Sequence, residues 1–274
     1  MDLEREDYQE PHCPFCTDQW QEEAPVHAIP IGRVLEKLDE YYSRDDFPGA
    51  LRLIDYWMAE AEDGNDLRGQ FSLRNELMGI YRKTGKKEQA TDNAEKALAL
   101  INKIGLEGSV TEGTALVNAA TVYKAFREPE KSIALFERAK NIYESYLKED
   151  ERLGGLYNNM ALTLADLGRL DDSQAMFLKA IESLESIPGT QAQQAISWLN
   201  IADVLAEKHG LAAAEDQIAE ACQKAAELLD SEEITRDGEY AYACEKCAPV
   251  FGYYGFFMAE EHFSEIARSI HERP

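Results

Sequence analysis

The chain has little of several features that define other protein classes. Its 274 residues include five cysteines, nine prolines and three tryptophans, and no run approaches the ~18 apolar residues that a membrane span requires. So few cysteines in a chain of this size favour a reducing compartment over a disulfide framework. The first residues, 1–7, are acidic where a secretory signal would be basic. We therefore expect a cytoplasmic protein with no membrane partner.

Positive charge is also scarce. The chain has 28 Lys and Arg against 52 Asp and Glu, a formal net charge of −24, and contains no basic helix or arm. A surface of this sign repels the phosphate backbone, so we expect no nucleic-acid partner. Two readings of the acidity stay open. It either keeps a helical protein soluble, or it favours basic partners.

Motifs for chemistry are equally sparse. The chain has no Gly-rich phosphate loop and no His-Glu-x-x-His zinc motif. Two Cys-x-x-Cys pairs occur, Cys13–Cys16 and Cys244–Cys247, but they lie at opposite ends of the chain. His12 and His27 could add ligands to the first pair, although the spacing fits no known zinc finger. Cys13–Cys16 also looks like a glutaredoxin motif without the flanking strand and helix. We predict no enzyme, no metal and no cofactor, with a metal or redox role of Cys13 and Cys16 left open.

What the chain does contain is a recurring unit. Its smallest common element is one small or apolar position that returns at intervals of 40 to 45 residues, at Leu38, Met78, Ala120, Ala161, Ala202 and Cys247. The fullest copy of the unit places small and bulky residues at fixed offsets, namely Tyr157, Ala161, Leu164, Gly168, Ser173, Phe177 and Ala180. Two further copies begin at Leu116 and Trp198.

This spacing resembles the tetratricopeptide repeat (TPR). The long unit resembles the repeats of kinesin light chains and of the peptide-sensing regulators of Gram-positive bacteria. The resemblance implies an all-α fold, a right-handed superhelical α-solenoid of about six helical hairpins. The expected repeats span approximately 31–68, 69–110, 111–151, 152–192, 193–236 and 237–274. Residues 1–30 are rich in Glu, Asp, Gln and Pro, and we expect an acidic, largely irregular tail there.

Local signals support this phase of the repeat. The small positions Ala120, Ala161 and Ala202 should be buried where two helices cross, because only a small side chain permits close approach. Ser109–Glu112 and Thr190–Gln193 have the pattern of capping boxes that begin helices. No segment alternates with period two, so we expect no sheet.

Three asparagines, Asn118, Asn159 and Asn200, occupy the same position of successive repeats. This position lies about 200° around the helix from the small alanine and should point away from the partner helix. An amide can both donate to and accept from a peptide backbone, and the resemblance implies such contacts at this position. Alternatively, the asparagines bridge neighbouring helices or are merely tolerated on a solvent-exposed face.

Further residues fall near the same stripe. The remaining candidate ligand-binding residues are Asn75, Lys83, Thr121, Lys124 and Asp203. Lys83 and Lys124 could receive a carboxylate of the ligand, or they are ordinary surface lysines. Asp203 lies at the opposite, acidic end, so a ligand with one basic and one acidic end would be oriented.

The sequence therefore predicts a non-catalytic adaptor or receptor that binds a protein or an extended peptide in the concave groove through the asparagines. One alternative is a self-assembling scaffold that associates through its aromatic C-terminal repeat. Another is a peptide-sensing regulator that acts through a partner. Whether the protein is a monomer or a homodimer stays open.

Overall fold

The structure is a computed structural model that describes residues 26–272. Within this range the chain forms twelve α-helices and a short 3-10 helix, with no strand, which confirms the all-α prediction. None of these helices is both long and apolar enough to cross a membrane. The pair Cys13–Cys16 lies outside the described residues. The chain divides into two compact units, Met1–Gln70 and Phe71–Pro274.

The first unit contains a helical hairpin made of α1 (Ile31–Tyr42) and α2 (Phe47–Asp63). Asp46 caps α2 by accepting a hydrogen bond from the Gly49 amide at 2.8 Å. The segment before α1 is anchored to the turn after α2, because His27 N–H donates to the Gly64 carbonyl at 2.9 Å. Buried Asp66 accepts a second bond, from the Ile29 amide, also at 2.9 Å.

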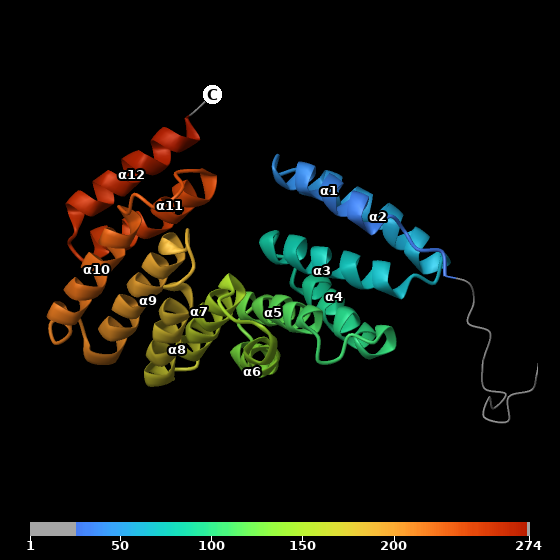
Figure 1. Ribbon diagram of the computed structural model, residues 1–274, viewed down its shortest axis with the longest axis horizontal. Coiled ribbons are helices and arrows are strands. Elements are labelled where there is room, and N and C mark those ends of the chain that lie inside the picture. Colours follow the sequence, from blue (N-terminus) through green and yellow to red (C-terminus); the bar gives the residue numbers. More distant parts are fainter. Residues whose placement is uncertain (1–25, 273–274) are drawn as a thin grey trace, which may run out of the picture. The chain divides into compact units, whose positions relative to one another are not determined.

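The second unit begins within α3 and contains the remaining helices (Figure 1). The helices of this part of the chain are α3 (Leu67–Lys83), α4 (Lys87–Leu100), the 3-10 helix η2 (Asn102–Ile104), α5 (Val110–Ala125), α6 (Pro129–Tyr146), α7 (Glu151–Asp166), α8 (Leu170–Leu184), α9 (Gln191–His209), α10 (Glu215–Leu229), α11 (Gly238–Tyr253) and α12 (Phe257–His271). Each helix from α5 to α12 packs most closely against its partner in a hairpin: α5 with α6, α7 with α8, α9 with α10, and α11 with α12.

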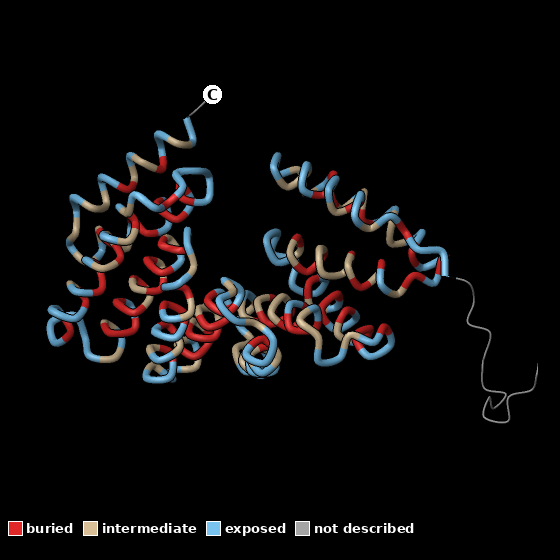
Figure 2. The backbone as a smooth tube through the Cα atoms, viewed as in Figure 1, coloured by how far each residue is buried: buried red, intermediate tan, exposed pale blue. Residues whose placement is uncertain are grey.

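Small residues hold these hairpins together. Ala120, Ala161 and Ala202 are fully buried, as the repeat pattern predicts. In two hairpins a buried serine adds a hydrogen bond between the paired helices, since Ser132 Oγ donates to the Ala120 carbonyl at 2.9 Å and Ser173 Oγ to that of Ala161 at 2.8 Å. Figure 2 shows buried residues concentrated where helices meet.

One of the two predicted capping boxes forms. Ser109 Oγ accepts from the Glu112 amide at 3.2 Å and begins α5. Thr190 makes no such bond at the start of α9. Its hydroxyl donates instead to the carbonyl of Leu184 at 2.8 Å, so this residue closes the preceding helix rather than capping the next.

Neighbouring hairpins pack through both of their helices. The second helix of one hairpin contacts the first helix of the next, as in α6 with α7 and α8 with α9. The first helices also contact one another, α5 with α7, α7 with α9 and α9 with α11. We call the surface formed by α5, α7, α9 and α11 the first-helix face. Six of the eight candidate residues lie on α5, α7 and α9 of this face, whereas Asn75 and Lys83 lie on α3.

The last hairpin combines a buried and an exposed part. Cys244 and Cys247 are buried, and burial raises the pKa of the Cys247 thiol to about 12. Phe251 and Phe263 stack in the core with ring centroids 5.4 Å apart. Tyr253, Phe257 and Met258, around the turn between α11 and α12, are instead 71%, 68% and 87% exposed.

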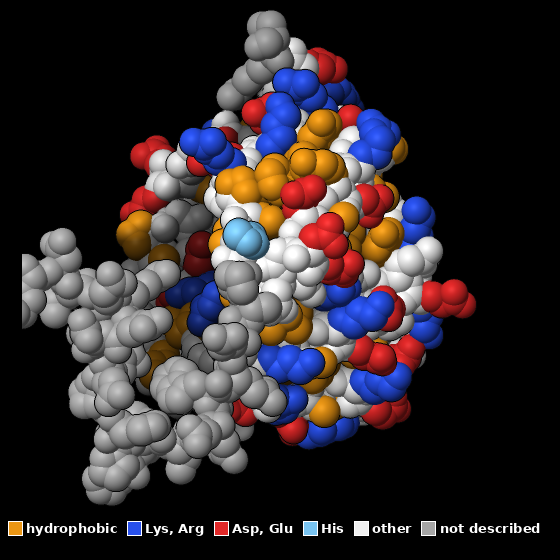
Figure 3. Space-filling model, turned by 90° about the vertical axis from the view of Figure 1, so that its right-hand side faces the viewer, with side chains coloured by type: hydrophobic (Ala, Val, Ile, Leu, Met, Phe, Trp, Pro, Cys, Tyr) orange, Lys and Arg blue, Asp and Glu red, His pale blue; other side chains and the backbone are white. Residues whose placement is uncertain are grey.

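Charges of both signs are mixed on the surface. On the side of the molecule drawn in Figure 3, basic side chains lie between acidic ones and apolar patches. Many pairs are local, such as Lys96 with Asp92 at 2.7 Å on α4. Exposed pairs of this kind add little to stability.

Candidate functional site on the first-helix face

The three predicted asparagines lie on successive first helices, Asn118 on α5, Asn159 on α7 and Asn200 on α9. Each side chain is half-buried rather than fully exposed. The sequence argument proposed either contact with a ligand or a bridge between helices. The structure contains hydrogen bonds that bridge neighbouring helices, and it leaves each of the three asparagines partly exposed.

The bridges run between adjacent first helices. Asn118 Nδ2 donates to Asn75 Oδ1 of α3 at 3.3 Å. Asn200 Nδ2 donates at 3.1 Å to Oδ1 of Asn158 on α7, a residue that the sequence analysis did not single out. Asn159 accepts from Lys124 Nζ of α5 at 3.2 Å, and its own Nδ2 donates to the Gly155 carbonyl at 2.9 Å. We call the five residues Asn75, Asn118, Asn158, Asn159 and Asn200 the amide row.

The asparagines of the amide row have more N–H donors than these hydrogen bonds use. An asparagine amide has two N–H donors and one carbonyl acceptor. Within residues 26–272, Asn118, Asn159 and Asn200 each donate one hydrogen bond. The second N–H of each partly exposed amide therefore remains available to another group. The existing bonds hold the side chains in fixed orientations, which lowers the entropy cost of ordering them.

Lys124 is the most perturbed group of the candidate set. Burial of its ammonium lowers the pKa to about 8. The nearby Asp166 carboxylate opposes this change, and the like charge of Arg82 adds to it. An anion placed beside Lys124 would favour the charged form and raise the pKa again.

The other predicted residues have varied surroundings. Lys83 lies at the exposed end of α3. Thr121 Oγ1 donates to the Asn118 carbonyl at 2.7 Å, a bond within its own helix. Asp203 is exposed and accepts from the Tyr254 hydroxyl of α11 at 2.7 Å. Partial desolvation raises the pKa of the Asp203 carboxyl, while that hydrogen bond opposes the rise.

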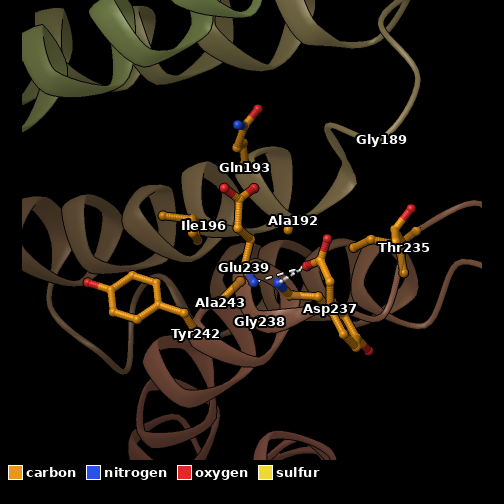
Figure 4. Close-up of a pocket in the computed structure, with 12 residues that line it drawn as sticks. Gly189, Ala192, Gln193, Ile196, Thr235, Asp237, Gly238, Glu239, Tyr242 and Ala243 are labelled. Atoms are coloured by element: carbon orange, nitrogen blue, oxygen red, sulfur yellow. Dashed lines mark hydrogen bonds between the residues drawn. The ribbon is translucent and has the colours of Figure 1, made fainter. Parts of the chain in front are cut away.

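A pocket of about 590 Å³ opens between the N-terminal halves of α9 and α11 and the loop that precedes α11. Figure 4 shows Ala192, Gln193 and Ile196 on the α9 side and Glu239, Tyr242 and Ala243 on the α11 side. Sequence reasoning did not find this pocket. One signal was present, because Gln193 and Ile196 precede Asn200 at helical spacing on the same stripe of α9.

Comparison with known proteins places the repeat in a family. Residues 152–227, which cover most of α7 to α10, match the family model of the tetratricopeptide repeat. This segment of the chain consists of tetratricopeptide repeats. Protein KINESIN LIGHT CHAIN-RELATED 1 of Arabidopsis thaliana is 26% identical to the chain over 112 residues, 40% of this chain and 18% of that protein. The chain thus aligns with less than a fifth of this curated relative.

Solved structures share the fold of this chain at low sequence identity. The apo form of RapI has a TM-score of 0.59 against this chain and is 12% identical in sequence. The match covers 89% of this chain and 98% of that one. The Rap conjugation gene regulator of the plasmid pLS20, solved in complex with the Phr* peptide, has a TM-score of 0.56 and 14% identity, covering 90% of this chain and 77% of that one. At these identities the likeness shows the fold alone.

The family match covers only part of the candidate site. Asn159, Asn200 and Asp203 lie inside residues 152–227. The rest of the predicted set lies before the match, at Asn75, Lys83, Asn118, Thr121 and Lys124. The helices nevertheless continue on both sides of the matched segment.

Proposed function

We propose that this TPR protein is a non-catalytic adaptor or receptor that binds an extended peptide segment along the first-helix face. The observation that carries the proposal is the amide row, in which partly exposed asparagines of successive first helices are held in place and retain N–H donors. Amides of this kind can bind peptide units regardless of side-chain identity. The Rap regulator with a bound Phr* peptide supports the proposal at the level of the fold.

The charges at the two ends of the row would orient the ligand. Lys124, with Lys83 and Arg82 on α3, offers positive charge at one end. Asp203 and the exposed Glu207 offer negative charge on α9. A peptide with an acidic group and a basic group would therefore prefer one direction, since complementary charge favours one register.

The proposal can be tested without knowing the natural ligand. Peptides are selected from a phage-displayed random library on the wild-type protein, and their dissociation constants are measured by fluorescence anisotropy. Each of Asn118→Ala, Asn159→Ala and Asn200→Ala should weaken binding by roughly 2- to 12-fold, the equivalent of one hydrogen bond. A control triple variant, Asn141→Ala/Gln174→Ala/Gln217→Ala, removes exposed or half-buried amides from the second helices and should bind normally. Equal affinities of the triple variant Asn118→Ala/Asn159→Ala/Asn200→Ala and of the control triple variant would refute the proposal.

Self-association is the second candidate function. Tyr253, Phe257 and Met258 form an exposed apolar cluster around the turn between α11 and α12. Clusters of this kind often mark protein contacts. Light scattering on the wild type and on Tyr253→Ser/Phe257→Ser tests it. A concentration-dependent mass that the double variant abolishes would favour a scaffold, whereas a monomer at all concentrations would exclude one that associates by this route.

A further inference from the structure

The pocket between α9 and α11 has a mixed lining. Its floor is apolar, with Ala192, Ile196, Ile234 and Ala243, and Tyr242 contributes a ring that is 57% exposed. The polar groups are Gln193, Thr235, Asp237 and Glu239. At about 590 Å³ the pocket is large enough for a long side chain of a ligand.

The charge of the pocket is negative. No Lys or Arg is among its lining residues, whereas two carboxylates are. The Asp237 side chain caps α11, because its Oδ1 accepts hydrogen bonds from the backbone amides of Glu239 and Tyr240 at 3.0 and 3.1 Å (Figure 4). Within residues 26–272 the Glu239 carboxylate has no ion-pair or hydrogen-bond partner. The pocket therefore presents one unpaired negative charge beside apolar walls.

Aromatic rings of this region already attract cations. Lys246 Nζ lies 5.2 Å from the centroid of the Tyr242 ring, and the Arg236 guanidinium lies 5.7 Å from that of Tyr240. Such contacts are favourable because the ring face carries negative charge density. A ligand cation that reached Glu239 would thus lie among apolar and aromatic groups that suit the stem of a long basic side chain.

The pocket continues the stripe that carries the amide row. Gln193, Ile196 and Asn200 follow one another on α9 at spacings of three and four residues, so they share one face of the helix. A peptide held by Asn200 would therefore run toward the pocket if it extended along α9.

We propose that this pocket binds an arginine or lysine side chain of the peptide, with Glu239 as its ion partner and Ala192, Ile196 and Tyr242 around its aliphatic stem. The identity of the ligand side chain rests on the proposed peptide-binding function. The pocket would supply the sequence preference that the amide row lacks. The amides hydrogen-bond to the peptide backbone, whereas Glu239 would pair only with a positively charged side chain.

The first experiment uses small probes that bypass the amide row. Protein labelled with ¹³C at the isoleucine δ1 methyls is titrated with N-acetyl-arginine amide and with N-acetyl-citrulline amide, which has nearly the same shape and no charge. The arginine probe should shift the methyl signals of Ile196 and Ile234 in a saturable way, and citrulline should bind at least about fivefold more weakly because the ion pair is lost. Equal binding of the two probes, or stronger binding of N-acetyl-phenylalanine amide, would overturn the proposal.

Two matched variants locate the charge. Glu239→Gln should remove the preference for arginine over citrulline while the methyl spectrum shows an intact fold. Glu265→Gln changes the same charge on the exposed surface of α12 and should preserve the preference. A preference that survives Glu239→Gln, or the absence of any saturable shift at Ile196 and Ile234 in the wild type, would refute the assignment.

A second experiment connects the pocket to the peptide. In a peptide selected on the wild type, replacing its arginine by citrulline should weaken binding to the wild type but not to Glu239→Gln. This result can fail while the probe titration succeeds, in which case the pocket binds a cation but does not act with the amide row. The amide-row variants can likewise fail while the pocket still binds the probe, so the two proposals are tested separately.

Discussion

Lys124 of α5 donates a hydrogen bond to Asn159 of α7, with Nζ and Oδ1 3.2 Å apart. This contact joins two predicted ligand-binding residues from neighbouring repeats. It also places an ammonium in a partly buried position where its pKa falls to about 8. The lysine is therefore partly neutral just above physiological pH, whereas an ordinary lysine stays charged.

The first prediction concerns the pH dependence of stability. Since the Lys124 pKa is lower in the folded state, the unfolded chain binds more protons between about pH 8 and pH 10.5, and this residue's contribution to stability must rise with pH there. The free energy of unfolding of the wild type relative to Lys124→Met should increase by about 1–2 kcal/mol between pH 7 and pH 9.5, allowing for partial solvent screening.

Urea unfolding at both pH values measures this difference. Comparison with the variant cancels the titration of tyrosines and cysteines, which both proteins share. Lys131→Met is a matched control, because Lys131 is exposed on α6 and its ion pair with Glu128 raises rather than lowers its pKa. A flat difference between wild type and Lys124→Met would contradict the assigned environment.

The second prediction separates the structural from the binding role of the amide row. Asn118 donates to Asn75 across two first helices at 3.3 Å, and both side chains are half-buried. Asn118→Ala should therefore reduce the free energy of unfolding by about 0.5–1.5 kcal/mol. In a double-mutant cycle with Asn75→Ala the two losses should not add, because both changes remove the same bond. Additive losses would show that the bond contributes nothing measurable.

Much of the fold could be predicted because packing determines the repeat. Ala120, Ala161 and Ala202 are small because a partner helix lies against them, and that requirement is visible in one chain. Caps were predicted less well. Thr190 has the spacing of a capping box, but its hydroxyl meets the Leu184 carbonyl at the end of α8. A competing acceptor from the preceding helix cannot be seen in a local pattern.

The candidate site was predicted only in part, for a related reason. Repeat position located Asn118, Asn159 and Asn200 on one face, since that face follows from helical geometry. It could not give their partners, because the distance between first helices depends on how whole hairpins pack. Asn158, one residue from the expected position, is the one that meets Asn200. The pocket at Glu239 was missed because its walls come from two repeats and a loop of irregular length.

A third prediction tests the packing at a helix crossing. Ala161 is fully buried within the core that also contains Phe177 and Leu199. Ala161→Leu must displace these neighbours and should cost about 1–3 kcal/mol in the free energy of unfolding. Ala125→Leu makes the same change at the exposed end of α5 and should alter stability by less than about 0.5 kcal/mol. Chemical denaturation of both variants makes the comparison, and equal effects would mean that the crossing lies elsewhere.

The last prediction concerns the tight turn inside each hairpin. Gly85 and Gly168 both adopt φ +70° between the two helices of their hairpins, a left-handed conformation that glycine tolerates. The turn between α5 and α6 has the same conformation at Arg127, with φ +61°. A residue with a Cβ pays about 1–2 kcal/mol for this conformation, while glycine loses about 0.4–1 kcal/mol through its freer unfolded chain. Arg127→Gly should therefore raise the free energy of unfolding by about 0.5–1 kcal/mol.

The reciprocal change provides the control for this turn. Gly168→Ala imposes the same strain on the turn between α7 and α8, where an added Cβ would meet no other atom. The free energy of unfolding should therefore fall by about 1 kcal/mol, and this loss would come from the backbone conformation alone. Arg127→Ala keeps the Cβ and removes only the exposed guanidinium, so it should leave stability nearly unchanged. If Arg127→Ala and Arg127→Gly stabilised the protein equally, the gain would come from removing a charge, and the backbone explanation would be wrong.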